Sequence, residues 1–200
     1  RPEDPFVASA LGVLLLRLGD EAGGRALLEE ARAKDRSDLR TVNTLNLLDR
    51  MERGGEFAEI GSGPLRIRMP AAEAGIWGDE LAARAGEILA AGEKAYGIRL
   101  EGGLLLEVFP TRDDFSVRTS GLVGLDAYGA CFGPLITMPS PGPRPFHWVE
   151  VLRHEISHSL TLDMSRGRIP RWLGEGLARR AETLPEPGAA VVFANGMRQG

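Results

Sequence analysis

Apolar residues return at spacings of three and four along the first fifty positions of the chain, which is the period of an amphipathic helix. Over residues 5–35 this pattern lies on both sides of the stretch "LGDEAGG" and predicts two helices joined by a turn. A further helix is expected over residues 38–52, where Val42, Leu45 and Leu48 share one face. The amino-terminal part of the chain is therefore predicted to be all-helical.

In the remainder of the chain, segments with the alternating apolar pattern of strands are followed by segments with the apolar pattern of helices. Residues 64–70, "PLRIRMP", alternate as a half-buried strand does. Residues 71–96 have the pattern of a long helix, with Gly97 where a left-handed cap is favoured. The stretch "GGLLLEVFP" is typical of a second strand, and Thr111, which follows it, can cap a short helix with its hydroxyl group.

A third strand-like run, residues 130–138, precedes a helix expected over residues 147–160 and another that begins near Pro170. Strands and helices in this order indicate an α+β fold. The change of pattern along the chain predicts a helical segment at residues 1–56 followed by a mixed domain at residues 57–200.

The first helices carry small and large residues in an order that resembles one tetratricopeptide repeat. The residues that carry this resemblance are Leu11, Gly12, Leu15, Gly19, Leu28 and Ala31. Because such repeats are stable only against their neighbours, the resemblance implies the tail of a longer array, with a protein partner bound on the helical repeats. The alternative is that these are helices of the main domain and that the likeness is due to chance.

The composition limits the classes of partner. The formal net charge of −4 and the pI near 5.5 provide no basic field for nucleic acid, so nucleic acid is not expected as a partner. Apolar runs such as "GLLLEVF" fall far short of the roughly 20 residues that cross a bilayer, so no membrane span is expected in this chain. Cys131 is the single cysteine, which excludes an internal disulfide and leaves the cellular compartment open.

The stretch "VLRHEISHSL" holds the most specific chemical signal in the sequence. It places His154 and His158 four residues apart within a predicted helix. Side chains at that spacing lie one above the other, so both imidazole rings can bind one metal ion. Glu155 points about 100° round the helix, where it can act as a base on a water at the open side of the ion. Leu152 and Ile156 contribute to an apolar stripe that would dock the helix on a core.

A hydrolytic zinc site usually has three protein ligands, and Glu175 is the candidate for the third. It follows His158 by 17 positions, in the stretch "IPRWLGEGLARR", which leaves room for a loop and a returning helix. Trp172 and Leu177 are expected to anchor that helix in the core. The glycines on both sides of Glu175 each cost about 1 kcal/mol relative to alanine within a helix, and they therefore indicate a close approach of two helices.

The segments "HEISH" and "PRWLGEGLA" together resemble the gluzincin metallopeptidases, and in particular the peptidase MA-like domains. The likeness covers residues 63–182 and is sharp only at these two motifs. It implies a zincin-like metallopeptidase domain, in which a mixed sheet supports an active-site helix, with Zn²⁺ as the cofactor. In that family the residues that match His154, His158 and Glu175 bind the zinc ion, and the residue that matches Glu155 is the catalytic base.

The same resemblance implies a zinc metallopeptidase that acts on a peptide or protein substrate. An endopeptidase is expected, because the segment with which related aminopeptidases recognise a free amino terminus is absent from the sequence. Residues 133–138 would be the edge strand of the sheet, and such a strand can bind an extended peptide through backbone hydrogen bonds.

One feature of the family is missing, because no Tyr or His follows Glu175. The residue that stabilises the oxyanion in many relatives is expected either beyond Gly200, in a domain that is incomplete at its C-terminus, or in Tyr128. The alternative function is a catalytically weak or inactive peptidase-like scaffold whose helical repeats bind other proteins. A zinc hydrolase with a different kind of substrate is a third hypothesis.

Overall fold

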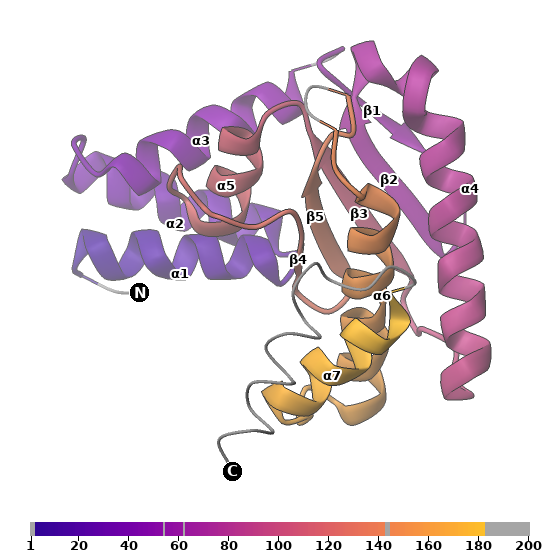
Figure 1. Cartoon of the computed structure of the whole chain (residues 1–200). Coiled ribbons are helices and arrows are strands. Elements are labelled where there is room, and N and C mark those ends of the chain that lie inside the picture. Colours follow the sequence, from indigo (N-terminus) through magenta and orange to yellow (C-terminus); the bar gives the residue numbers. More distant parts are fainter. Residues whose placement is uncertain (1–2, 54, 62, 143–144, 183–200) are drawn as a thin grey trace, which may run out of the picture.

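A mixed sheet lies between two groups of helices in the computed structural model of the chain (Figure 1). The structure describes residues 3–53, 55–61, 63–142 and 145–182. The helices of this part are α1 (Pro5–Arg17), α2 (Glu21–Lys34), α3 (Leu39–Glu52), α4 (Ala71–Tyr96), α5 (Arg112–Ser120), α6 (Trp148–Ser165) and α7 (Arg171–Ala181). The strands are β1 (Phe57–Ile60), β2 (Leu65–Pro70), β3 (Leu104–Phe109), β4 (Ala130–Cys131) and β5 (Leu135–Pro139).

Aspartate caps and a close crossing of two helices shape the helical segment α1 to α3. Each of these helices begins at an aspartate whose side chain accepts a hydrogen bond from a backbone N–H of the first turn: Asp4, Asp20 and Asp38. A Cβ atom built on Gly12 would lie only 2.8 Å from Cγ of Leu28, so a larger residue would push α1 away from α2. The helices expected in this part of the chain are confirmed, and the longer array stays a prediction.

The sheet has the strand order β1-β2-β3-β5-β4. Its three central strands run parallel, with Ile67 opposite Leu106 and Leu106 opposite Ile136. β1 pairs with β2 at one edge and β4 pairs with β5 at the other, and both of these pairs are antiparallel. The expectation of an α+β fold with a mixed sheet is confirmed. The mixed domain expected at residues 57–200 extends past the described residues, and the division of the chain into domains stays a prediction.

The expected position of the edge strand is wrong. β5 lies second from the edge of the sheet, because β4 pairs with its residues Ile136 and Thr137. Gly133 has a φ of 81°, a conformation that favours glycine, and it lies in the turn that folds the run of residues 130–138 back on itself. The single strand that the sequence suggested is therefore a short hairpin, and its first arm, β4, forms the edge.

The two faces of the sheet are covered by different helices. One face carries Val108 and Met138, which pack in the main hydrophobic core with α4 and α6. On the other face Phe109 and Phe115 share a smaller core with Leu47 of α3. Helix α3 therefore packs directly on β3 and α5.

A buried ion pair lies on this second face. Nε of Arg118 in α5 is 2.7 Å from Oε2 of Glu107 in β3, and both side chains are 1% exposed. Nη1 of Arg68 lies 3.2 Å from the other carboxylate oxygen of Glu107 and 2.7 Å from Glu21 of α2. Burial raises the pKa of the Glu107 carboxyl, although the two neighbouring guanidinium groups act against that shift. These charges connect the helical segment to the sheet.

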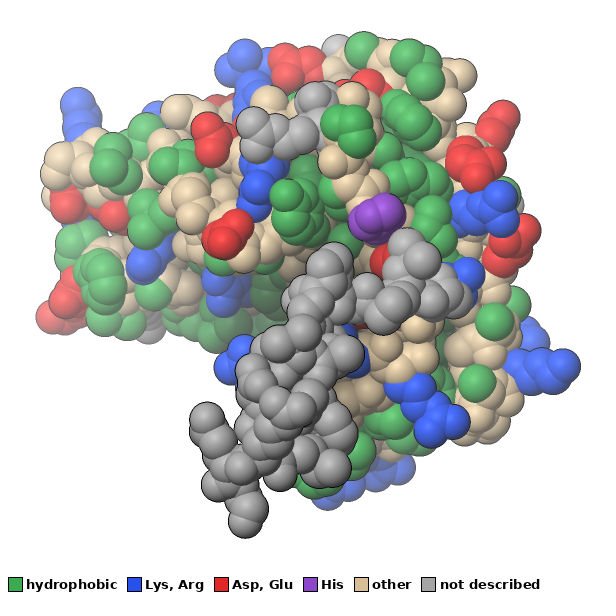
Figure 2. Space-filling view, viewed as in Figure 1, with side chains coloured by type: hydrophobic (Ala, Val, Ile, Leu, Met, Phe, Trp, Pro, Cys, Tyr) green, Lys and Arg blue, Asp and Glu red, His purple; other side chains and the backbone are tan. Residues whose placement is uncertain are grey.

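Among the described residues, no helix combines the length and the apolar character that crossing a membrane requires, as the sequence leads one to expect. Figure 2 shows acidic and basic side chains scattered over the visible face, with neither sign gathered into one large patch.

Candidate metal centre

Helix α6 turns its two histidines away from the main core. Leu152, Ile156 and Leu160 are each at most 1% exposed and pack in that core, which confirms the apolar stripe expected on this helix. These residues fix the rotation of α6 about its axis. His154 and His158 consequently lie on the opposite side, and their side chains are each 19% exposed.

Helix α7 returns along α6 after a tight turn. Arg166 and Gly167 end α6 with φ angles of 52° and 71°, which reverse the direction of the chain. Gly174 and Ala178 are the buried residues of α7, and a Cβ atom on Gly174 would lie 3.8 Å from Nδ1 of His158. Short side chains on this face of α7 therefore allow it to lie close to α6.

The expectation that Trp172 anchors α7 in the core is wrong. Its side chain is 75% exposed, and Leu177 is only half-buried. Gly174 and Ala178 occupy the face of α7 that is buried. A bulky anchor is unnecessary there because a close helix contact is made by small residues.

Three side chains meet between the two helices, and we call them the histidine–glutamate cluster: His154, His158 and Glu175. Nε2 of His154 and Nε2 of His158 are 3.0 Å apart. Oε2 of Glu175 lies 3.5 Å from the first of these nitrogens and 3.6 Å from the second. The Glu175 side chain is 47% exposed, so the cluster is open to solvent on one side. The structure brings together the three residues that the two sequence motifs single out.

Glu182 is a further residue of the site that the sequence analysis missed. Its Oε1 lies 2.6 Å from Nδ1 of His154, and its side chain is 12% exposed. Nη1 of Arg179 lies 3.2 Å from the other carboxylate oxygen. A carboxylate that accepts the Nδ1 proton leaves Nε2 of His154 free to bind a metal ion. Glu182 is the C-cap residue of α7, so its contact with His154 depends on how α7 packs on α6, and no local pattern in the sequence indicates it.

Glu155 lies against the backbone at the edge of the sheet. It is 8% exposed, and a Cβ atom on Gly129 would lie 2.7 Å from its Oε1. Gly129 directly precedes β4, so the carboxyl group of Glu155 is beside the edge strand. Burial, together with the negative charges of Glu175 and Glu182, raises the pKa of Glu155 to about 8. A nearby cation would have the opposite effect on that pKa.

Burial lowers the pKa of His158, and the neighbouring His154 lowers it further, whereas Glu175 acts in the opposite direction. The neutral form of His158 is favoured as a result. Neutral imidazole is the form that binds a metal ion.

Tyr128 has its contacts elsewhere. Its hydroxyl oxygen lies 3.5 Å from Nη1 of Arg112, and its ring stacks on Phe146 with 5.0 Å between the ring centroids. Among the described residues, Tyr128 forms no hydrogen bond or ring contact with the histidine–glutamate cluster. The role of Tyr128 in oxyanion stabilisation stays a prediction. His147, the remaining histidine, is the N-cap residue of α6 and also lies outside the cluster.

No protein-family model matches the chain, and no curated protein or solved structure matches it either.

Proposed function

We propose that the chain is a zinc-dependent hydrolase that cleaves peptide bonds, with Glu155 as its general base. The observation that carries the proposal is the convergence of one ligand atom from each of His154, His158 and Glu175 within 4.8 Å of one another. Two of these atoms come from one turn of α6 and the third from α7, as the zincin-like arrangement expected from the two motifs requires.

The donor atoms suit zinc both in kind and in spacing. Two imidazole nitrogens and one carboxylate oxygen are a donor set of catalytic zinc sites. Tetrahedral ligands that bind an ion at about 2.0 to 2.1 Å lie about 3.3 to 3.4 Å from one another. The three distances in the histidine–glutamate cluster are 3.0, 3.5 and 3.6 Å. A site with three protein ligands leaves a fourth position for water, which is typical of catalytic rather than structural zinc.

The positions of the site residues suggest a separate role for each of them. Bound Zn²⁺ would supply a water of lowered pKa and would polarise the carbonyl oxygen of a substrate. Glu155 would accept the proton of the attacking water and then donate it to the leaving amine, so that a C–O bond forms as the C–N bond breaks. Glu182 would hold His154 in the tautomer that presents Nε2 to the ion.

The edge strand supports a peptide as the substrate. In the described part of the chain, β4 pairs on one side only, with β5. An extended peptide can add to such a free edge through backbone hydrogen bonds. Gly129, which directly precedes β4, lies beside the carboxyl group of Glu155, so a peptide bound at this edge would pass close to the proposed base.

A peptide-cleavage assay with Glu155→Gln tests the proposed function. We expect the zinc-loaded chain to cleave members of a mixed peptide library, and we expect the variant to keep its zinc but to cleave at least about a hundred times more slowly. Glu87→Gln, a change at an exposed position of α4, is the control and should leave the rate unchanged. Cleavage by the Glu155 variant at the unaltered rate would show that another group acts as the base.

A second candidate function is the peptidase-like scaffold. It is favoured by the outer face of α1, where Phe6 and Leu18 are each 63% exposed and Leu14 is 45% exposed. Exposed apolar side chains along one helix are typical of a surface that binds another protein. A chain that binds zinc but cleaves no peptide in the assay above would support this candidate.

A further inference from the structure

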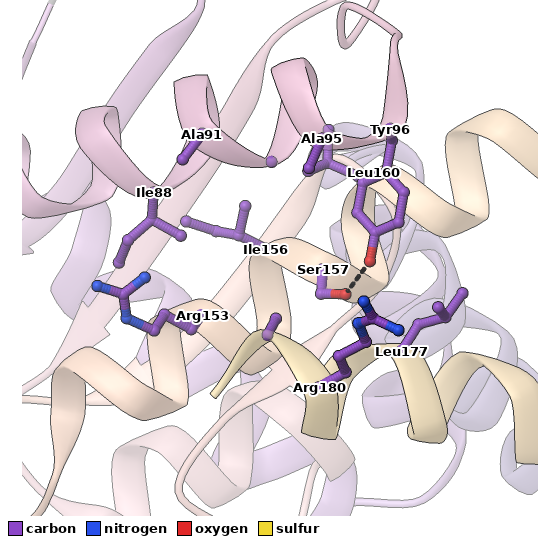
Figure 3. Close-up of a pocket in the computed structure, with 12 residues that line it drawn as sticks. Ile88, Ala91, Ala95, Tyr96, Arg153, Ile156, Ser157, Leu160, Leu177 and Arg180 are labelled. Carbon is purple, nitrogen blue, oxygen red and sulfur yellow. Dashed lines mark hydrogen bonds between the residues drawn. The ribbon is translucent and has the colours of Figure 1, made fainter. Parts of the chain in front are cut away.

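A groove separate from the histidine–glutamate cluster lies between α4, α6 and α7 (Figure 3). Its volume is about 410 Å³, within the range of about 300 to 1,000 Å³ that is typical of small-molecule sites. None of the three residues of the cluster lines it. The apolar part of its lining is formed by Ile88, Ala91, Gly92, Ala95, Ile156, Leu160, Leu177 and Ala181.

Small residues of α4 create this groove. A Cβ atom on Gly92 would lie 2.5 Å from Cδ1 of Leu160, so α4 touches α6 at this point. Ala91 and Ala95 are exposed and have short side chains, so α4 leaves the space above α6 unfilled. Figure 3 shows both alanines on the α4 side of the groove, with Leu177 of α7 on the other side.

The groove lining also includes two arginines, Arg153 and Arg180, whose guanidinium groups lie well apart from each other (Figure 3). The acid closest to Arg153 in the described residues is Glu150, at 3.8 Å, and Nε of Arg153 is buried without a hydrogen-bond partner there. Arg180 forms no ion pair with any described residue. An apolar groove with one cation that forms no ion pair among the described residues, Arg180, is complementary to an apolar molecule with one anionic end.

We propose that this groove binds a medium-chain fatty acid, with the alkyl chain against the apolar lining and the carboxylate at Arg180. A peptide fits the lining less well, because the walls are helices whose backbone groups are already hydrogen-bonded within each helix. The hydroxyl groups of Tyr96 and Ser157 are likewise paired with each other, at 2.9 Å. The groove therefore offers apolar contact and positive charge, and few partners for a peptide backbone.

Calorimetric titration of the full chain with decanoate, below its micelle concentration, tests this proposal. We expect one saturable site per chain that binds decanoate at least tenfold more tightly than decanol, which has the same tail and no charge. Arg180→Gln should weaken decanoate binding roughly tenfold and leave decanol binding unchanged. Arg84→Gln, at a cation of α4 that does not line the groove, should leave both unchanged.

Ala95→Phe, a second variant, fills the groove from an exposed position and should abolish binding without loss of folding, as judged by circular dichroism. A carboxylate could also bind at a metal ion in the histidine–glutamate cluster. Binding of that kind would survive Ala95→Phe and would overturn the proposal, as would equal affinities for decanoate and decanol. Because neither variant touches the cluster, the result is independent of the proposed zinc chemistry.

Discussion

Replacing Glu182 by glutamine should weaken zinc binding without removing any of the three proposed ligands. The Glu182 carboxylate lies 2.6 Å from Nδ1 of His154 and is 12% exposed, so its charge acts on the imidazole ring with little screening by water. Glutamine has nearly the same shape and keeps an oxygen that can accept the Nδ1 proton. It removes the negative charge that favours the tautomer with a free Nε2 and that raises the basicity of the ring.

The expected size of this effect follows from what each variant removes. Loss of a hydrogen-bonding partner behind a metal-binding histidine typically reduces metal affinity 10- to 100-fold, or about 1.4 to 2.8 kcal/mol. Glu182→Gln should fall near the lower end, because a hydrogen bond to His154 remains. Glu182→Ala should fall near the upper end, because both the charge and the hydrogen bond are lost.

Competition with a chromogenic zinc chelator measures these affinities directly. The tautomer of His154 in the metal-free chain provides an independent readout, since the ¹⁵N chemical shifts of the ring distinguish a protonated Nδ1 from a protonated Nε2. Glu87→Gln serves as the control for a lost carboxylate elsewhere. Unchanged zinc affinity in both Glu182 variants would refute the reasoning, as would an unaltered tautomer in the alanine variant.

Two further predictions concern stability. Gly129→Ala should lower the free energy of unfolding by about 1 to 3 kcal/mol, because the new Cβ atom would lie 2.7 Å from Cγ1 of Val151 and from Oε1 of Glu155. Urea denaturation measures this change, and an unaltered unfolding midpoint would contradict the prediction. Asp38→Ala should cost about 1 kcal/mol at neutral pH through the loss of an N-cap. Burial opposes ionisation of Asp38, but hydrogen bonds such as that from Thr41 outweigh it and lower the pKa in the folded chain. The stabilisation is therefore complete above the unfolded pKa of about 3.9 and is lost as the pH falls through the folded pKa, so the two chains should converge in stability in acid.

The elements with strong local signals were predictable from the sequence. Helix α4 ends at Tyr96 because Gly97 adopts the left-handed conformation there, with a φ of 67°. Helix α5 begins after Thr111, whose hydroxyl accepts a hydrogen bond from the backbone N–H of Asp114 at 3.0 Å. Both signals are contained within a few residues of the chain, and no distant contact is needed to interpret them.

Features that depend on distant contacts were not predictable. β1 has only four residues and is defined by its pairing with β2. The apolar pattern of residues 130–138 predicts one strand where the structure has the hairpin of β4 and β5, because the pattern does not show where the chain turns back. The apolar character of Trp172 predicts a core residue, yet the buried residues of α7 are Gly174 and Ala178.

The residues of the candidate site likewise differ in how far the sequence predicts their positions. His154 and His158 are four residues apart on one helix, so their convergence follows from helix geometry alone. Glu175 could be proposed from its flanking glycines and its distance along the chain. The contact between Glu182 and His154 could not, because it requires the relative placement of α6 and α7.

The zinc content of the purified chain tests the central claim most directly. Elemental mass spectrometry should find close to one zinc ion per chain after mild chelation, and Glu175→Gln should lose most of that zinc under the same treatment, because one of three ligands becomes a neutral and weaker donor. Glu87→Gln should retain it. A chain that holds no zinc even after reloading, or a Glu175 variant that retains zinc as firmly as the unaltered chain, would contradict the proposed three-ligand site.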